Sequence, residues 1–189
     1  MELQRGVVGD LAAFPDLRQA VADVGLIDLA GAVCRAARAV GTPVVHCTAE
    51  FRPDRLGSSL NCRMLAAADK LNAGNLDTGS PGTELVPELG VSESDVVVAR
   101  THGLTPFTST DLDQILRNMG VTTVVAVGSS INVGILGLVL SAVDLGYTVV
   151  VPADAVVGVP PEYGRTVMSN TIALLATIVS VEDLVKSWG

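Results

Sequence analysis

The chain has 189 residues, of which 49% are hydrophobic, and a formal net charge of −8 at pH 7. This length is enough for one domain with a substantial buried core, and no repeat or composition break divides it, so we predict a single domain over residues 1–189. Its 12 lysines and arginines are scattered singly, which excludes a basic nucleic-acid surface or an anionic-membrane patch. No apolar run reaches the roughly 20 residues needed to span a bilayer, and no basic-then-apolar leader is present. We therefore expect a cytoplasmic protein that acts on or binds a small molecule.

The predicted elements alternate between helices and continuous β-branched strands. In chain order they are a helix over 26–40, a strand over 43–46, a short helix over 64–70 within long loops, a strand over 95–99, a helix over 110–119, a strand over 121–127, a helix over 132–145, a strand over 147–151, a helix over 161–176 and a weaker strand over 177–181. Apolar strands of this kind are typical of parallel sheets covered on both faces. Right-handed crossovers between them predict an α/β fold with an open, doubly wound, mostly parallel sheet flanked by helices.

Ligands in such sheets bind beyond the carboxyl ends of the strands. This rule selects Glu2, residues 46–50, residues 100–102, residues 128–134 and Asp154 as candidate site positions. An ordinary loop role is the alternative for each of them.

The cysteines and histidines indicate neither a disulfide framework nor a zinc site. Cys34, Cys47 and Cys62 are odd in number and form no C-x-x-C pair, and the chain has only two histidines. We expect three reduced thiols.

Three stretches of the sequence resemble the motifs of one family. They are "MELQRG", "PFTSTDLDQILRNMGVTTVVAVG" and "GSSINVGILGLVLSAVDLGYTVVVPADAV", and together with the segments between them they cover nearly the whole chain. On these motifs the chain resembles the isochorismatase-like hydrolase superfamily, also called the cysteine hydrolases. The resemblance implies a six-stranded parallel sheet in a Rossmann-like three-layer arrangement, and homo-oligomer contacts through apolar surface.

The resemblance also assigns a catalytic set, which is substituted here. The family's Asp, Lys and Cys match Glu2, Thr101 and Gly134. A glycine offers no nucleophile, so the thioester route is closed at this position. Isochorismatases of the same superfamily also resemble this pattern, with Gly in the Cys position. They need no nucleophile, because their reaction protonates a vinyl carbon and adds water. Glu2 is then the candidate general acid, provided that burial raises its pKa.

Positive charge and substrate contacts are predicted from neighbouring positions. Arg100, beside Thr101, is either a cation for a carboxylate substrate or a solvated arginine at a strand end. The resemblance implies a cis peptide before Ser130, with the backbone N–H groups of Ser130 and Gly134 forming an oxyanion hole at a helix start. The remaining candidate substrate contacts are Asn132, which is also a candidate helix cap, Phe107, and the loop arginines Arg52 and Arg55, whose alternative is a solvated loop.

No metal or other cofactor is predicted. Nicotinamidase-type relatives place an Asp and two His after the second strand, where this chain reads "HCTAEFRPDRLGSS" and offers only His46. Cys47, at the end of the same strand, is either a replacement nucleophile or a small buried hydrophobe, and we favour the second.

The amino-terminal position raises a separate expectation. Relatives carry several apolar residues before the acidic position, and these form a central strand, whereas here Met1 directly precedes Glu2. Loss of a central strand would leave its neighbours with unpaired backbone groups. We therefore expect the natural chain to begin upstream.

Three functions remain open from the sequence. The first, which we favour, is a hydrolase that acts on a small carboxylate-bearing molecule without a covalent cysteine intermediate. The second is a catalytically inactive protein that binds a small molecule, and the third is a structural subunit of a homo-oligomer. Turnover separates the first from the others, and stabilisation by a ligand separates the second from the third.

Overall fold

The computed structural model describes residues 1–189 and confirms an α/β fold with parallel strands and flanking helices. The strands are β1 (Val45–Ala49), β2 (Val96–Arg100), β3 (Thr123–Val125), β4 (Gly128–Ser129), β5 (Thr148–Pro152), β6 (Val156–Val157) and β7 (Thr177–Val179). The helices are α1 (Pro15–Val24), α2 (Leu26–Ala39), α3 (Arg63–Asn72), α4 (Pro106–Ser109), α5 (Leu112–Asn118), α6 (Leu136–Asp144), α7 (Pro161–Asn170) and α8 (Val181–Trp188). None of the helices combines the length and the apolar character that a membrane crossing requires.

The strands form three separate parallel groups, not one continuous six-stranded sheet. The groups are β1–β2, β3–β5–β7 in that order, and β4–β6. Their registers are illustrated by the pairs His46↔Val97 and Val124↔Val149. Met1 and Glu2 lie between β1 and the segment from Val127 to Ser129, and their backbone groups bond to both.

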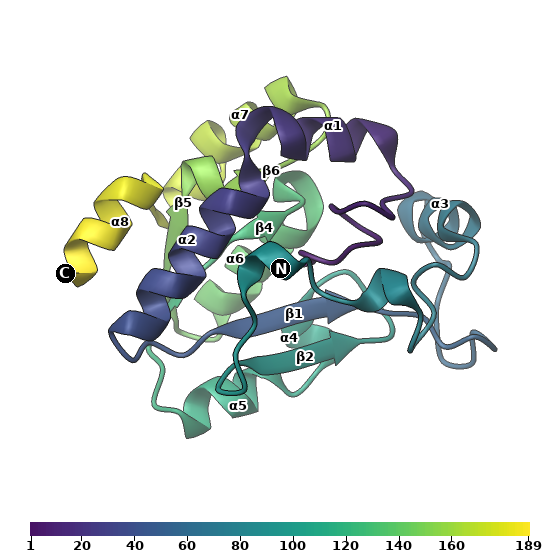
Figure 1. The fold of residues 1–189 in the computed structure, drawn as a ribbon, viewed down its shortest axis with the longest axis horizontal. Coiled ribbons are helices and arrows are strands. Elements are labelled where there is room, and N and C mark those ends of the chain that lie inside the picture. Colours follow the sequence, from purple (N-terminus) through teal and green to yellow (C-terminus); the bar gives the residue numbers. More distant parts are fainter.

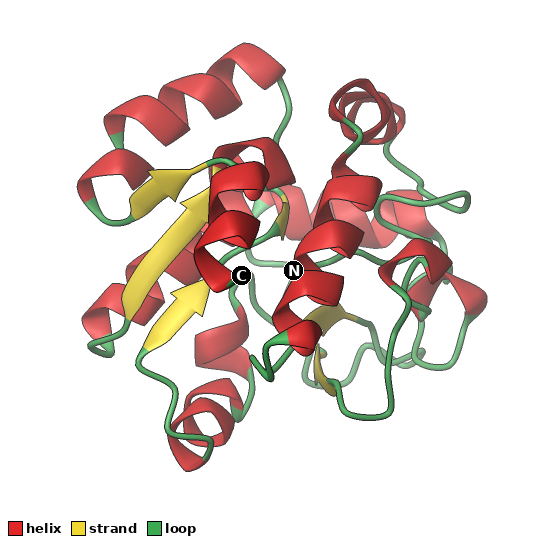
Figure 2. Cartoon of the chain, turned by 60° about the vertical axis from the view of Figure 1, so that its left-hand side comes forward, coloured by secondary structure: helices red, strands yellow, loops and turns green.

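Helices cover both faces of the β3–β5–β7 group, as the strand pattern predicts (Figure 2). Successive residues of β5 point to opposite faces: Val149 and Val151 join a core of 17 buried residues, whereas Val150 packs on the cluster formed with α2 and α8. The 17-residue core includes Val139 of α6 and Phe107 of α4, so α4 and α6 lie on the face opposite α2 (Figure 1). A strand buried on both faces explains why β5 reads as a continuous apolar run.

Several expected elements shift their ends or change type. β1 begins two residues later than predicted and continues through polar Thr48 to Ala49, because pairing with β2 extends to Arg100. The helix predicted over 161–176 ends at Asn170. The strand predicted over 177–181 ends at Val179, where Ser180 accepts a hydrogen bond from the backbone N–H of Asp183 and begins α8.

Other elements were not predicted at all. These are α1, α4, α8 and the two-residue strands β4 and β6. The predicted strand over 121–127 is shortened to β3 at Thr123–Val125. The predicted short helix over 64–70 is confirmed as α3.

The amino-terminal residues lie inside the fold. The backbone N–H of Glu2 donates to the carbonyl of Cys47 at 2.8 Å, and the Ser129 N–H donates to the Met1 carbonyl at 3.1 Å. The Gln4 side chain, which is fully buried, satisfies both backbone groups of Ala49, at 2.8 and 2.9 Å. Figures 1 and 2 both show the amino terminus in the middle of the molecule. The segment therefore joins β1 to β4 through backbone bonds, and the Gln4 side-chain amide adds two bonds to the end of β1.

Candidate functional site

A cavity of about 310 Å³ lies where β1 and β2 end and the chain turns from β4 into helix. Its wall takes residues from the amino-terminal segment, the starts of α1 and α3, the residues after β1 and β2, and the turn η3 (Ile131–Ile135), which leads into α6. This is the edge at which parallel sheets place their ligands. The cavity is therefore the candidate functional site of the chain.

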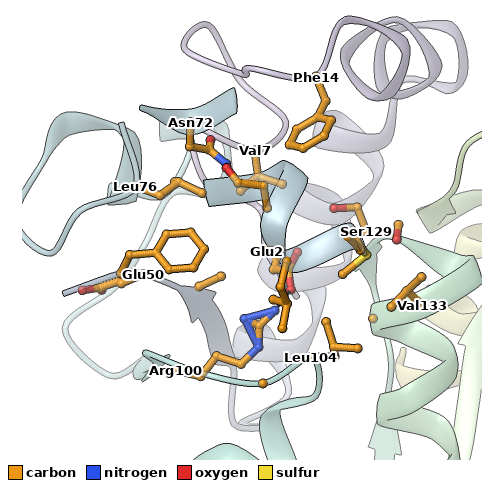
Figure 3. A pocket seen from close by; sticks show the side chains of 18 of the residues that line it. Glu2, Val7, Phe14, Glu50, Asn72, Leu76, Arg100, Leu104, Ser129 and Val133 are labelled. Atoms are coloured by element: carbon orange, nitrogen blue, oxygen red, sulfur yellow. Dashed lines mark hydrogen bonds and ion pairs between the residues drawn. The ribbon is translucent and has the colours of Figure 1, made fainter. Parts of the chain in front are cut away.

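An ion pair between Glu2 and Arg100 forms one side of the cavity. The Arg100 Nη2 donates to the Glu2 Oε1, and the two side chains are 10% and 17% exposed. Figure 3 shows the guanidinium directed at Glu2. Arg100 is the last residue of β2, whereas Glu2 is held by its backbone bond to Cys47 and has a positive φ of 53°. Two chain segments 98 residues apart thus bring opposite charges together on the wall.

The opposite side of the cavity is formed by the turn after β4. The Ser129–Ser130 peptide is cis, and the Ser130 N–H donates to no acceptor within the chain. Gly134 presents no side chain, and a Cβ atom there would lie 2.8 Å from Met1 Cε and 3.3 Å from the Ser129 carbonyl oxygen. The Met1 side chain therefore lies against the position at which the family resemblance predicts a nucleophile.

Four buried polar atoms of the wall residues have no hydrogen-bond partner. They are Asn72 Oδ1, Arg100 Nε, Ser129 Oγ and Asn132 Oδ1. The Asn132 amide nitrogen donates to the Val159 carbonyl at 3.1 Å, so the side chain fastens the turn to a distant loop and does not cap the helix. Unpaired buried polar atoms cost free energy in a folded protein. Their concentration around one cavity indicates a place for a polar ligand group.

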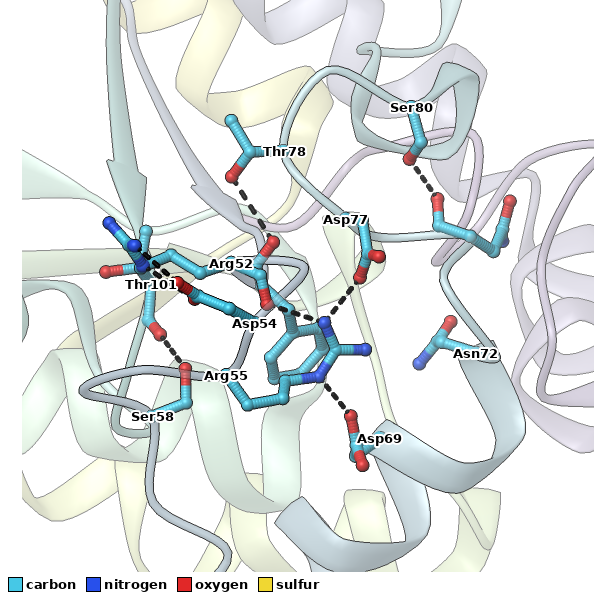
Figure 4. Close-up of polar contacts among 12 residues, drawn as sticks. Arg52, Asp54, Arg55, Ser58, Asp69, Asn72, Asp77, Thr78, Ser80 and Thr101 are labelled. Carbon is cyan, nitrogen blue, oxygen red and sulfur yellow. Dashed lines mark hydrogen bonds and ion pairs between the residues drawn. The ribbon is translucent and has the colours of Figure 1, made fainter.

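The loop arginines predicted to hold substrate do not line the cavity (Figure 4). Arg52 pairs with Asp54 at 2.7 Å, close by in sequence and exposed to solvent. Arg55 is held between Asp69 at 2.6 Å and Asp77 at 2.7 Å. Both guanidinium groups are therefore engaged in ion pairs, and that of Arg55 fastens the loop after β1 to α3 and to the turn that follows it.

Thr101 and Phe107 also lie outside the cavity wall. The Thr101 carbonyl accepts a hydrogen bond from the Ser58 hydroxyl at 3.0 Å, which ties the end of β2 to the loop after β1. Phe107 is buried in the core, with its ring 5.7 Å from that of Tyr147. Of the nine predicted site residues, the structure brings Glu2, Arg100, Ser130, Asn132 and Gly134 together at the cavity.

Other residues of the wall were not selected from the sequence. Phe14 and Leu17 come from the start of α1, an element that was not predicted. Met64 and Leu65 come from the predicted short helix, but nothing in the sequence indicated which of its faces meets the site. Glu50 and His102 fall within stretches that the strand-end rule selected, although neither was assigned a role.

No cysteine lines the cavity. Cys47 is buried, and burial raises the pKa of its thiol. The preceding residue, His46, lies 2.8 Å from Asp95 through its Nε2, away from the site. No three His, Cys, Asp or Glu side chains are grouped as metal ligands would be. The cavity wall thus offers a ligand acid–base side chains and backbone N–H groups.

The fold and the site together define a class: an α/β domain with a small-molecule cavity at the carboxyl edge of parallel strands. The isochorismatase domain family matches residues 3–183, and the chain belongs to that family.

Sequence relatives are similar over part of their length. The uncharacterized isochorismatase family protein YecD of Escherichia coli O157:H7 is 30% identical over 100 residues, which make up 52% of each chain. The uncharacterized isochorismatase family protein YwoC of Bacillus subtilis strain 168 is 38% identical over 72 residues, 38% of each chain. The chain thus spans about half the length of the first of these relatives and less of the second.

Solved structures are similar over nearly the whole chain. An isochorismatase family protein of Desulfovibrio vulgaris superimposes with a TM-score of 0.82 at 25% identity, covering 98% of this chain and 94% of that one. N-carbamoylsarcosine amidase of Thermoplasma acidophilum gives a TM-score of 0.73 at 24% identity, covering 95% and 92%. Because the amidase is only 24% identical to this chain, its similarity shows a shared fold alone.

Proposed function

We propose that the protein is a hydrolase of the isochorismatase type that acts on a small carboxylate-bearing molecule without a covalent cysteine intermediate. The observation that carries this proposal is the composition of the cavity wall. It combines the Glu2–Arg100 ion pair with a side-chain-free Gly134 and contains no thiol. Such a wall has groups for proton transfer but no sulfur nucleophile.

Glu2 is the proposed proton donor. The carboxylate that pairs with Arg100 first takes up a proton from solvent. For an enol ether, this acid form gives its proton to the vinyl carbon, and water adds to the resulting oxocarbenium ion. Loss of a proton from the added water restores the acid form of Glu2, and the hemiketal then separates into a carbonyl compound and an alcohol. Arg100 stabilises the carboxylate that remains after the first proton transfer. The charge on Glu2 is thus compensated at the moment when it forms.

The turn after β4 is the proposed site for the substrate carboxylate. The free Ser130 N–H lies at the start of the helical segment formed by η3 and α6, where a negative charge is favoured. The unpartnered Ser129 hydroxyl is available to donate to the same group. Glu2 and this turn lie at the same cavity, so one small molecule can meet both.

A second candidate function is binding without catalysis, either as a small-molecule binder or as a subunit of an oligomer. The observation that favours it is the placement of Thr101, the family's lysine position, outside the wall. Arg100, the cation that does reach the wall, is already paired with Glu2. A cavity with this arrangement can retain ligand affinity after its chemistry is lost.

Turnover separates the two candidates. The wild type, Glu2→Gln and Glu93→Gln are assayed with isochorismate, maleamate, nicotinamide and N-carbamoyl compounds. Glu93 is exposed and is not part of the cavity wall, so Glu93→Gln is the matched control. We expect wild-type turnover of one substrate to fall at least about 100-fold in Glu2→Gln and to persist in the control.

Two other outcomes have defined meanings. Equal turnover by wild type and Glu2→Gln would contradict the assigned role of Glu2. No turnover, together with a rise in thermal midpoint on adding one of these compounds, would establish the binding function. Amidase activity gained by Gly134→Cys in that case would show that the cavity still positions a substrate.

A further inference from the structure

The substrate cavity has a polar end and an apolar end. The polar end carries the groups that the proposed reaction uses, among them Glu2 and Arg100. Much of the remaining wall comes from the amino-terminal loop, the start of α1, and the segment from α3 to the turn after it. We call five hydrophobic residues of these elements the apolar end: Val7, Phe14, Leu17, Leu65 and Leu76. In Figure 3, Val7, Phe14 and Leu76 lie in the upper part of the view, above Glu2 and Arg100.

The apolar end is held in place by the fold. Val7 and Leu76 belong to one hydrophobic cluster and are 9% and 5% exposed. The Phe51 N–H donates to the Leu76 carbonyl at 2.8 Å, and Asn75 Nδ2 donates to the Leu11 carbonyl at 2.8 Å. These bonds fasten the turn after α3 to the residues after β1 and to the amino-terminal loop. The apolar end is therefore preformed, and its shape limits which ligands fit.

One buried polar side chain, that of Asn72, lies with the apolar end. Asn72 is the last residue of α3, lines the cavity and is 5% exposed, and Figure 3 shows it in the same part of the view as Val7 and Leu76. Its Nδ2 donates to the Ala68 carbonyl at 2.7 Å. A carbonyl group only accepts, so this bond fixes which end of the amide is the nitrogen. The Asn72 Oδ1 has no hydrogen-bond partner in the chain and is left as an acceptor for a ligand.

The donor that suits Asn72 is uncharged. An ammonium group buried among apolar side chains needs a compensating carboxylate. The two acidic residues nearest to Asn72 in sequence, Asp69 and Asp77, are already paired with Arg55, at 2.6 and 2.7 Å. Glu50, a further carboxylate of the wall, lies apart from Asn72 in Figure 3. A hydroxyl group or an amide N–H satisfies the acceptor without bringing a charge.

We propose that Asn72 determines the substrate specificity of the cavity by accepting a hydrogen bond from a neutral hydroxyl or amide N–H group on the apolar part of the substrate. The substrate class is thus a carboxylate whose carbon skeleton is apolar except for one such donor. This role rests on the proposed function, which places the carboxylate at the polar end, and it adds a second point of recognition. A substrate of this class meets both ends of the cavity of about 310 Å³, whereas a short polar compound fills only one.

Asn72 discriminates between ligands more sharply than the apolar side chains do. An apolar wall distinguishes two ligands by the hydrophobic surface that each buries, and one added hydroxyl changes this surface little. A bound ligand without a donor leaves the Asn72 Oδ1 unpaired and keeps water from it, which is costly. We therefore expect the cavity to reject the ligand that lacks the donor.

The test compares the affinities of three proteins for a set of matched carboxylates, measured by isothermal titration calorimetry. The proteins are the wild type, Asn72→Leu and the control Asn61→Leu, since Asn61 is exposed and is not part of the cavity wall. The ligands are cyclohexanecarboxylate and its 3-hydroxy, 4-hydroxy, 4-carbamoyl and 4-amino derivatives. We expect the wild type and the control to bind a hydroxy or carbamoyl derivative about tenfold more tightly than the parent acid, and Asn72→Leu to lose this preference.

The ratio of two affinities separates recognition from folding. A general effect of the substitution on the protein changes the affinity for the parent acid and for its derivative alike, so it cancels in the ratio. Asn72→Ala repeats the comparison with a smaller side chain that cannot crowd the cavity. The ratios measured on the wild type need no variant at all.

Several results would overturn the proposal. They are equal wild-type affinity for the parent acid and all derivatives, no binding of any of them, tightest binding of the cationic 4-amino derivative, and a preference that persists in both Asn72 variants. Preference for a hydroxy or for the carbamoyl derivative supports the proposal and identifies the donor. Loss of the preference in Asn72→Leu, without turnover of an enol ether built on the preferred skeleton, would reject the hydrolase function and retain the role of Asn72 in recognition.

Discussion

The substrate cavity differs in its lining from the apolar space between β1 and β3. The wall of the substrate cavity carries unpaired side-chain atoms of different elements, such as Arg100 Nε and Ser129 Oγ. The apolar space between β1 and β3 is lined by 22 residues, of which 18 are hydrophobic. Scattered polar groups in a concave wall suit a small molecule of matching shape, whereas buried apolar side chains stabilise the fold. The two cavities therefore differ in what a substitution on their walls should change.

The largest expected effect contrasts one leucine on each wall. Leu138 is 5% exposed and borders the apolar space between β1 and β3, while Leu104 is half-buried and borders the substrate cavity. We expect Leu138→Ala to lower the free energy of unfolding by about 2–4 kcal/mol, because the core cannot collapse around the lost side chain. We expect Leu104→Ala to lower it by less than about 1 kcal/mol, because Leu104 is only half-buried. Urea denaturation measures both. Equal losses would show that the two cavities are energetically alike.

A second prediction concerns the acid sensitivity of the β1–β2 pair beside the apolar space. Burial alone would raise the pKa of Asp95, but hydrogen bonds from Arg38, His46 and the Ser92 N–H hold it well below its usual range. A lowered folded-state pKa stabilises the protein above about pH 4, the unfolded value, and this contribution is lost as the pH falls towards the folded value. We expect the wild type to lose about 1 kcal/mol more between pH 6 and pH 3 than Asp95→Asn does, measured from urea midpoints.

The control for this second prediction is an exposed acidic residue. Asp23 lies on the surface of α1. We expect the free energy of unfolding of Asp23→Asn to depend on pH as that of the wild type does. An identical pH dependence of Asp95→Asn and the wild type would contradict the role given to the Asp95 carboxylate.

An effect no larger than this is expected at the loop that borders the substrate cavity. Arg55 joins Asp69 and Asp77 with partly buried groups, whereas Arg52 and Asp54 form an exposed pair. We expect Arg55→Ala to cost about 1 kcal/mol and to speed amide exchange in the loop, and Arg52→Ala to change stability by less than about 0.5 kcal/mol. Exchange measured by mass spectrometry on both variants tests the difference. Equal behaviour would show that Arg55 does not fasten the loop.

The smallest expected effect on stability is at Ser129. Its hydroxyl is fully buried and has no partner, so Ser129→Ala removes a desolvated polar atom without breaking a hydrogen bond. We expect the free energy of unfolding to stay within about 0.5 kcal/mol of wild type or to rise, while affinity for a carboxylate ligand falls about tenfold. Thermal midpoints with and without ligand separate the two effects. A large loss of stability without ligand would show that the hydroxyl has a structural partner.

The sequence by itself determined the α/β class and the edge of the fold that carries the cavity. Continuous apolar runs such as the one that became β5 can be buried on both faces only in a covered parallel sheet. This pattern lies in consecutive residues, so it can be recognised in the sequence. The motif that carries Gly134 and the acidic residue Glu2 indicated the family. The match of the isochorismatase domain family to residues 3–183 confirms it.

Only the tertiary structure decided which side chains face each other. Glu2 and Arg100 meet although 98 positions separate them, and Arg55 is bound by Asp69 and Asp77 instead of remaining free for a ligand. The apolar space between β1 and β3 likewise depends on how far apart these two strands come to lie. Local propensity says which residues become strands, but the pairing of distant segments is set by long-range packing, and that depends on the whole chain at once.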